Sequence, residues 1–269
     1  MVERPVGVFD SGVGGLTVVS ELSRILPQED IIYFGDTAHL PYGSKSKEAV
    51  TRFSLDIANF LKKQKVKIII VACNTASSFA LSSLREKINL PVIGVIEPGA
   101  QAAIDNTRNL KIGIIGTEGT IKSRTFEEAI KKIDRNVNIF SQACPLFVPL
   151  VEEGWLDEPE TLQIAEKYLS PLKDKGIDTL ILGCTHYPLL KELFSRIMGQ
   201  EVSLIDTAEA TAKTVERTLG EKKLLRKGNH KAVYKFFVSD DPEKFLQLGR
   251  RFLGKNIDKA ERVDLEAME

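Results

Sequence analysis

Short apolar runs rich in β-branched residues alternate along the chain with longer segments whose apolar positions recur at helical spacing. The short runs lie at 6–9, 31–34, 68–72, 92–96, 112–115, 137–140, 179–183 and 202–205. Runs of this length are typical of strands buried on both faces, and the periodic segments between them predict amphipathic helices. The alternation is that of βαβ units, so the sequence predicts an α/β protein built on parallel sheets with helices on both faces.

The pattern occurs twice. VGVFDSGVGG, from residue 6, resembles IGIIGTEGT, from residue 112, and IIIVACNT, from residue 68, resembles TLILGCTH, from residue 179. We therefore expect two similar α/β domains, each with a Gly/Ser/Thr turn after its first strand and a cysteine after a later one. The length of 269 residues agrees with this, since a domain usually takes ~100–200 residues. A helix at 208–219, a strand at 232–238 and a helix at 242–253 follow, and their pattern alone assigns them to neither domain.

Cys73 and Cys184 each close an apolar strand. Ligands of parallel α/β sheets collect at the carboxyl ends of the strands, so both thiols are expected at ligand-facing edges. A helical pattern follows each cysteine, with Asn74 or Thr75 as the expected cap of the first helix and Pro188 in the first turn of the second. A helix N-terminus favours thiolate, which predicts a cysteine pKa below the reference of ~8.5.

The sequence gives less support to other roles for the cysteines, as core residues, zinc ligands or a redox disulfide. A single cysteine at the end of a strand is by default a small core residue, but two at matching positions of a repeat require that coincidence twice. Cys144 has no counterpart and is interpreted as packing. A zinc site of Cys73, Cys184 and His186 lacks the close cysteine pair of structural zinc sites, and a redox disulfide lacks a C-x-x-C motif.

Composition narrows the classes of partner. The chain has 37 basic and 37 acidic residues, so it lacks the broad positive field that draws nucleic acid. No secretion signal opens the sequence and no run approaches the ~18 apolar residues of a spanning helix, so no membrane partner and a cytoplasmic location are expected. Three cysteines in a reducing compartment are expected to be thiols rather than structural disulfides.

Three polar stretches are candidates for a site. DSGVGG at 10–15 matches a dinucleotide fingerprint poorly, because Thr17 stands where the third glycine belongs, and its amides could equally hold a carboxylate. Asp10 opposes anion binding unless it handles protons, and the alternative is a turn or capping aspartate. The loop at 35–46 turns at 41–44 and could present amides and hydroxyls. Glu152 and Glu153 read as a solvated pair unless one of them is partly buried.

Seven motifs together resemble glutamate racemases. In chain order they are GVFDSGVGGLTV, GDTAHLPYGS, VACNTAS, VIGVIEPGA, IGTEGT, CPLFVPLVEEG and LGCTHYPLL, and the resemblance runs from Val6 to about Thr207. It implies interconversion of L- and D-glutamate without pyridoxal phosphate or metal, supplying D-glutamate for peptidoglycan. It further implies a homodimer and an active site between a first domain of residues 1–97 plus 207–269 and a second domain of residues 98–206.

The same resemblance assigns roles. Cys73 and Cys184 would be the two acid/base residues, with Cys73 taking the proton from D-glutamate and Cys184 from L-glutamate. Asp10 would assist Cys73, His186 would assist Cys184, and Glu152 matches a further acidic position of the family. The implied substrate contacts are Asp10, Ser11, Tyr42, Gly43, Asn74, Thr75, Thr185 and His186, with Thr117 and Thr120 as weaker candidates.

Related functions remain open at this point. A racemase for aspartate or hydantoins would have the same architecture, and only a panel of substrates separates it. A one-cysteine decarboxylase is disfavoured because both thiols are present. An amino-acid-binding module without turnover is disfavoured by the presence of Asp10, Cys73, Cys184 and His186 together, and binding without α-proton exchange would establish it.

Overall fold

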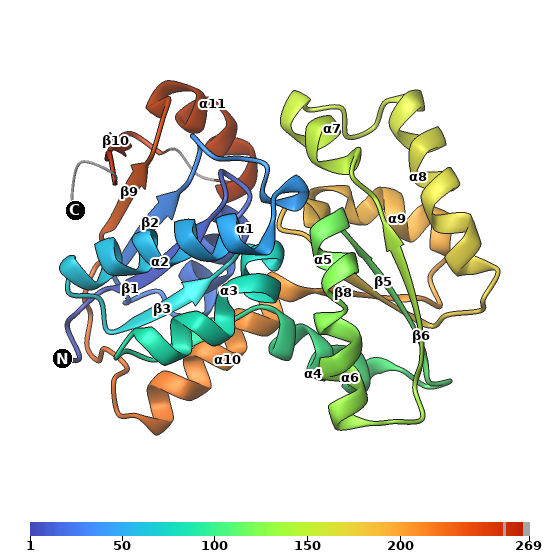
Figure 1. The fold of residues 1–269 in the computed structure, drawn as a ribbon, viewed down its shortest axis with the longest axis horizontal. Helices are drawn as coiled ribbons and strands as arrows, with labels where there is room; N and C mark the ends of the chain where they lie inside the picture. The colour runs from blue at the N-terminus through green and yellow to red at the C-terminus, as the bar shows by residue number, and fades with distance from the viewer. Residues whose placement is uncertain (255–256, 266–269) are drawn as a thin grey trace.

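Two parallel β-sheets form the framework of the molecule (Figure 1). The computed structural model describes residues 1–254 and 257–265. The larger sheet has six strands in the order β10-β9-β2-β1-β3-β4, and the smaller has four in the order β6-β5-β7-β8. Every pairing between neighbouring strands is parallel. The predicted fold class, two parallel-sheet α/β units, is confirmed.

The strands lie close to the predicted apolar runs. In the larger sheet they are β1 (Val6–Asp10), β2 (Ile31–Gly35), β3 (Ile68–Val71), β4 (Val92–Gly94), β9 (Tyr234–Val238) and β10 (Glu261–Arg262). In the smaller sheet they are β5 (Lys111–Gly116), β6 (Asn138–Ala143), β7 (Thr179–Gly183) and β8 (Ser203–Asp206). The run at 92–96 stops being a strand at Gly94, because Val95 already has helical backbone angles as the N-cap of α4.

Helices cover both sheets. In the first half of the chain they are α1 (Leu16–Ile25), the 3₁₀ turn η1 (Tyr42–Ser44), α2 (Lys47–Lys63), α3 (Asn74–Lys87) and α4 (Ile96–Asn106). In the second half they are α5 (Glu118–Ser123), α6 (Thr125–Ile133), α7 (Phe147–Glu153), α8 (Pro159–Lys173), the 3₁₀ turn η2 (Tyr187–Leu190), α9 (Lys191–Met198), α10 (Thr207–Glu221) and α11 (Pro242–Leu253). Within the described residues, none of these helices is long and apolar enough to cross a membrane.

The end of the chain returns to the larger sheet. After β8, helix α10 packs against α1 and α4, and β9 then pairs in parallel with β2, with Ile31 opposite Tyr234. Helix α11 covers α1, beside the larger sheet, on the same side of the molecule as α7, which lies beside the smaller sheet (Figure 1). The segment that the sequence pattern could not assign thus adds two strands to the first sheet.

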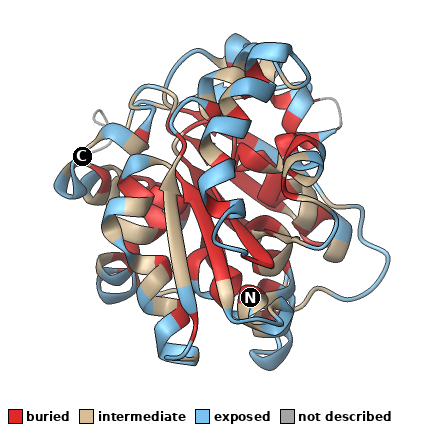
Figure 2. Ribbon diagram, turned by 90° about the vertical axis from the view of Figure 1, so that its right-hand side faces the viewer, coloured by how far each residue is buried: buried red, intermediate tan, exposed pale blue. Residues whose placement is uncertain are grey.

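Burial explains why the central strands are mostly apolar. All residues of β1, β3 and β7 are buried, as expected where helices cover both faces of a parallel sheet. The smaller sheet faces the viewer in Figure 2, with buried strands inside and exposed helix faces outside. Its edge strand β6 is only half-buried. The buried strands form a rigid support for the polar residues at their carboxyl ends.

Candidate active site

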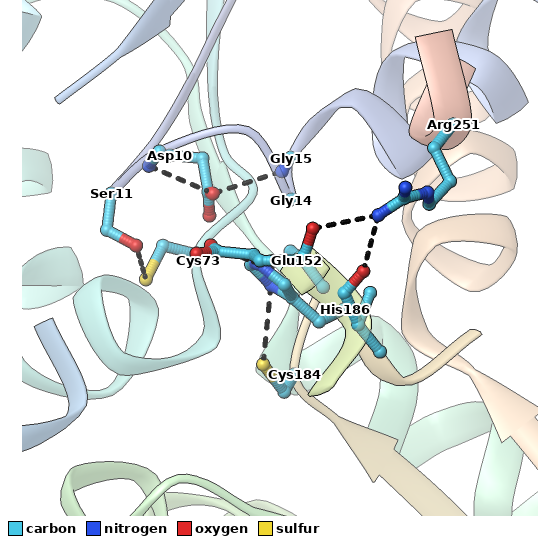
Figure 3. A network of polar contacts seen from close by, with 12 residues as sticks. Asp10, Ser11, Gly14, Gly15, Cys73, Glu152, Cys184, His186 and Arg251 are labelled. Atoms are coloured by element: carbon cyan, nitrogen blue, oxygen red, sulfur yellow. Dashed lines mark hydrogen bonds and ion pairs between the residues drawn. The ribbon is translucent and has the colours of Figure 1, made fainter. Parts of the chain in front are cut away.

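The loops that follow β1, β3, β5 and β7 meet where the two sheets face each other. Thr75, after β3, has its hydroxyl 2.9 Å from that of Thr117 and 3.2 Å from that of Thr120, both after β5. The Thr17 hydroxyl donates to the backbone carbonyl of Thr185, after β7, at 3.2 Å. Figure 3 shows side chains from both sheets pointing into this junction. The site is therefore built by both halves of the repeat.

Two glycines permit this close approach. A Cβ placed on Gly14 would lie 2.3 Å from the Thr185 hydroxyl oxygen and 2.5 Å from Nδ1 of His186. A Cβ on Gly43 would lie 2.7 Å from Cβ of Thr117. Any side chain at either position would displace residues of the opposite half. The glycine-rich turn after β1, which offered a weak nucleotide-binding motif, serves here to bring the two halves into contact.

Cys73 lies at the start of α3, at the end of β3. It is itself the N-cap, because its Sγ accepts from the Ala76 amide at 3.5 Å, so the prediction that Asn74 or Thr75 caps this helix is wrong. The same sulfur lies 3.8 Å from Oγ of Ser11. Asn74 is buried, and both polar atoms of its side chain find no hydrogen-bond partner among the described residues. Its amide is therefore available to a bound molecule.

Asp10 is a fully buried carboxyl at the end of β1. Its Oδ2 accepts from the amides of Gly12 at 3.2 Å and Gly15 at 3.0 Å, while Oδ1 is left without a partner in the part of the chain described. Burial raises the pKa of Asp10, and the electrostatic interaction with His186 and the hydrogen bonds from the turn amides only partly offset this. Asp10 thus does accept from the turn, as the capping interpretation requires, and also presents a free, proton-accepting oxygen.

Cys184 lies beside a histidine and a glutamate. Nδ1 of His186 is 4.0 Å from Sγ of Cys184, and Nε2 of the same ring is 2.9 Å from Oε1 of Glu152 (Figure 3). The Glu152 side chain is only 23% exposed, whereas Glu153 is exposed, so the pair is not a uniformly solvated one. The result is a chain of three groups, Cys184, His186 and Glu152, in which each can influence the proton of the next.

The predicted lowering of the cysteine pKa values is wrong in direction. Burial, followed by the charge of Asp10, raises the pKa of Cys73 to about 12, although hydrogen bonds from Ala76 and Ser11 act against it. Burial also raises the pKa of Cys184, and a charge on Cys73 raises it further. Loss of water contact costs a thiolate more than a helix end returns.

The helix after Cys184 also differs from the prediction. The 3₁₀ turn η2 stands between the thiol and α9, so Pro188 is the second residue of a short turn rather than part of the first turn of a long helix, and the helix dipole at Cys184 is correspondingly weak. Burial therefore disfavours a thiolate at both cysteines, and a charge on Cys73 raises the pKa of Cys184 further, which disfavours two thiolates at once.

The loop after β2 is anchored by a residue that sequence reasoning missed. The Tyr42 hydroxyl donates to Oδ2 of Asp36 at 2.5 Å, and the Ser239 hydroxyl donates to Oδ1 at 2.7 Å. Nδ1 of His39 lies 2.9 Å from the same carboxylate. Asp36 is buried, and it fixes the turn that brings Gly43 against Thr117. Its position directly after a strand was the one available signal.

The described residues include neither a disulfide nor a cluster arranged for a metal ion. All three cysteines are free, and Cys144 is buried in the largest hydrophobic cluster, which includes residues of both sheets. Within residues 1–254 and 257–265, no group of three or more His, Cys, Asp and Glu side chains is arranged to hold a metal ion. Figure 3 shows Cys73, Cys184, Asp10 and His186 at one junction, whereas the Cys144 thiol donates to the backbone carbonyl of Gln142 at 3.6 Å.

The fold has two parallel sheets whose carboxyl ends meet, with one cysteine after a strand of each sheet, and these features define a class of protein. Comparison with known proteins identifies that class. The family model for Asp/Glu/Hydantoin racemase matches residues 10–215, so the chain belongs to this family. Among curated relatives, the glutamate racemase of Geobacter metallireducens is 52% identical over 264 residues, covering 98% of each chain. That of Neisseria meningitidis serogroup A is 49% identical, covering 98% of this chain and 97% of its own. The predicted resemblance is confirmed.

Solved structures agree at the level of the whole chain. A glutamate racemase isoform from Bacillus anthracis superposes with a TM-score of 0.95 at 42% identity, covering 98% of this chain and 99% of its own. The glutamate racemase of Francisella tularensis in complex with D-glutamate gives 0.93 at 42% identity, covering 99% and 100%. An aspartate racemase homologue from Pyrococcus horikoshii, at 17% identity and a TM-score of 0.59, shares the fold alone.

Proposed function

We propose that this protein is a glutamate racemase that interconverts L- and D-glutamate by a cofactor-independent, two-base proton transfer at Cα. One observation carries the proposal: two buried thiols, from matching positions of the two halves, lie at one junction (Figure 3). Racemisation removes a proton from one face of Cα and returns one to the other, so it needs a proton carrier on each side. Cys73 and Cys184 supply one from each half of the repeat.

The raised pKa values suit this reaction. The α-proton of an amino acid is far less acidic than a thiol, and a thiolate that is expensive to form is a strong base once formed. The ammonium group of bound glutamate brings positive charge beside the thiols, which lowers the cost of a single thiolate. Cys73 takes the proton from D-glutamate while Cys184 stays a thiol and protonates the other face, and the roles exchange for L-glutamate.

Neighbouring groups assist each thiol. The free oxygen of Asp10 serves the Cys73 side, and His186, held by Glu152 through Nε2, serves the Cys184 side. Glu152 fixes the orientation of the imidazole, as a carboxylate commonly does for a histidine that moves protons. General acid/base assistance of this kind contributes about 10²–10⁴-fold to the rate.

The substrate is held by donors at the same junction. The N-termini of α3 and α5 face it, and helix N-termini bind carboxylates through free amides. Because the Tyr42 hydroxyl is occupied by Asp36, Tyr42 contributes its backbone rather than its side chain. The remaining contacts that we propose are Ser11, Gly43, Asn74, Thr75, Thr117, Thr120, Thr185 and His186. A donor that meets the developing charge is worth about 3 kcal/mol.

The wider setting is also part of the proposal. We divide the chain into a first domain of residues 1–97 plus 207–269 and a second of residues 98–206, which agrees with the strands of the two sheets. A cytoplasmic homodimer that supplies D-glutamate for peptidoglycan follows from the resemblance to glutamate racemases.

The test is α-proton exchange. Purified, chelator-treated protein is incubated with L-glutamate in D₂O without added cofactor, and deuterium at Cα and optical rotation are followed together. Deuteration with loss of rotation supports the proposal. A folded protein that binds glutamate but does neither is a binding module, and the proposal then fails. Aspartate and a hydantoin are run in parallel, because faster turnover of either would make this chain a sister enzyme of the same family.

A further inference from the structure

Helix α11 reaches from the larger sheet to the residues around Cys184. Nη1 of Arg251 donates to two backbone carbonyls at the end of α7, that of Val151 at 2.9 Å and that of Glu152 at 2.8 Å (Figure 3). Carbonyls in the last turn of a helix lack partners within the helix, and a cation there is favourable. The arginine thus closes the end of α7 at the residue whose side chain holds His186.

The residues next to this contact, Gly154 and Phe252, are compatible with it. Helix α7 ends at Glu153 and is capped by Gly154, whose φ of +84° lies in the left-handed region. A Cβ on Gly154 would lie 2.6 Å from Nη2 of Arg251, so glycine leaves room for the guanidinium as well as permitting the turn. The next residue of α11, Phe252, is buried and packs edge-on against the His186 ring, with the ring centroids 5.0 Å apart.

The surroundings of the two thiols differ in which half of the molecule supplies them. The thiol of Cys73 is contacted by Ser11 and by the amide of Ala76, both of which belong to the half that carries Cys73. On the Cys184 side, the groups that hold Glu152 and His186 include Arg251 and Phe252, which come from α11 and thus from the half built on the larger sheet. The geometry around His186 therefore depends on how the two halves meet.

We infer that Arg251 is a positioning residue for proton transfer at Cys184: it holds the end of α7 so that Glu152 keeps His186 aligned with the thiol, and it does so only while the two halves are in contact. The inference rests on the two-thiol function proposed above. Loss of Arg251 slows the step at Cys184 and leaves the step at Cys73 intact.

The equilibrium between L- and D-glutamate restricts which kinetic measurement can reveal a slower step at Cys184. The two enantiomers have equal free energy, so kcat/KM must fall equally in both directions whichever step is slowed. The primary isotope effect separates the steps, because L-glutamate deuterated at Cα is attacked by Cys184 and D-glutamate by Cys73. A slower Cys184 step makes abstraction from L-glutamate more rate-limiting. It also lets the intermediate formed from D-glutamate return, so the isotope effect rises for L-glutamate and falls for D-glutamate.

The experiment compares Arg251→Ala with Arg250→Ala, an exposed neighbour on the same helix. We expect kcat/KM of Arg251→Ala to fall about tenfold to a hundredfold in both directions, as for a small misplacement of a reacting group, with the ratio of the L to the D isotope effect increased. Arg250→Ala should match the unaltered protein in both measurements. Arg251→Lys, whose ammonium can reach one carbonyl, should restore part of the rate and of the ratio.

Three results would overturn the inference: Arg251→Ala that behaves like Arg250→Ala, a lost rate with an unchanged isotope-effect ratio, or a ratio that shifts toward D-glutamate. If Arg251→Ala does not fold by circular dichroism, Arg251→Lys carries the test and its ratio must shift in the same direction. Failure of the unaltered protein to racemise glutamate would instead refute the proposed function, so the two failures are distinguishable.

Discussion

At the scale of single residues, Asp10 places a carboxylate where its charge is costly. It is fully buried, one oxygen lacks a partner among the described residues, and its pKa is raised. We predict that Asp10→Asn increases the free energy of unfolding while it removes most of the activity. The amide keeps an oxygen to accept from Gly12 and Gly15 but carries no charge to desolvate.

The sign of the pH dependence follows from the raised pKa. The folded protein holds the Asp10 proton more tightly than the unfolded chain, so its stability falls as pH rises from the ordinary aspartate pKa through the raised one. The stability gained by Asp10→Asn should therefore be larger at pH 7.5 (roughly neutral) than at about pH 4. Urea unfolding at both pH values measures it, and a constant difference would mean that the Asp10 pKa is not raised.

The thiols give the second prediction at this scale. Cys73→Ser and Cys184→Ser should each lower kcat by about 10³-fold or more, because a serine hydroxyl is a far weaker acid and a poor proton carrier. Cys144→Ser is the matched control, since Cys144 is also buried but its thiol donates to the backbone carbonyl of Gln142 rather than to a residue of the site. It should lose stability and keep its activity. Racemisation by either site variant at the rate of the Cys144 variant would refute the two-thiol mechanism.

At the scale of elements, the loop between β2 and α2 depends on one buried carboxylate. Asp36→Ala would strand the buried Tyr42 hydroxyl, which costs about 1–3 kcal/mol, and would free the turn that holds Gly43 against Thr117. We predict a raised KM for glutamate together with reduced stability. Ser239→Ala removes one donor to the same carboxylate and should have a smaller effect on both. Steady-state kinetics with thermal unfolding test this, and an unchanged KM in Asp36→Ala would count against a role for the loop in binding.

The elements also show where sequence reasoning succeeds and where it stops. The strands and the residues at their carboxyl ends were predictable, because apolar runs and parallel topology are local signals with a fixed geometric consequence. Arg251 was not, because nothing around it in the chain indicates that α11 meets α7. The thiol pKa values were predicted with the wrong sign, because a helix N-terminus is visible in the sequence whereas the burial that outweighs it is a property of the assembled fold.

At the scale of the whole molecule, the two ends of the strands in the larger sheet differ in their role. The carboxyl ends carry Asp10 and Cys73, whereas the amino ends, where Lys67 precedes β3, join distant parts of the chain. Nζ of Lys67 donates to the carbonyls of Val2 at 2.7 Å and Leu224 at 2.8 Å, and it forms a fully buried ion pair with Glu29. The buried ion pair that stabilises the fold thus lies at the opposite end of the strands from the residues proposed for catalysis.

That separation leads to the last prediction. Lys67→Met leaves the Glu29 carboxylate buried without its partner, and such a loss typically costs about 3–5 kcal/mol. Lys67→Met with Glu29→Gln should recover much of this, because the charge is removed and the glutamine oxygen can still accept from the Arg226 amide, as Oε1 of Glu29 does at 2.8 Å. Kinetics measured well below the unfolding transition should give the same KM and kcat for all three proteins. A KM that changes in the folded Lys67 variant would show that the two ends of the strands are coupled, whereas a double variant as unstable as the single one would show that the unpaired Glu29 charge is not the cause of the instability.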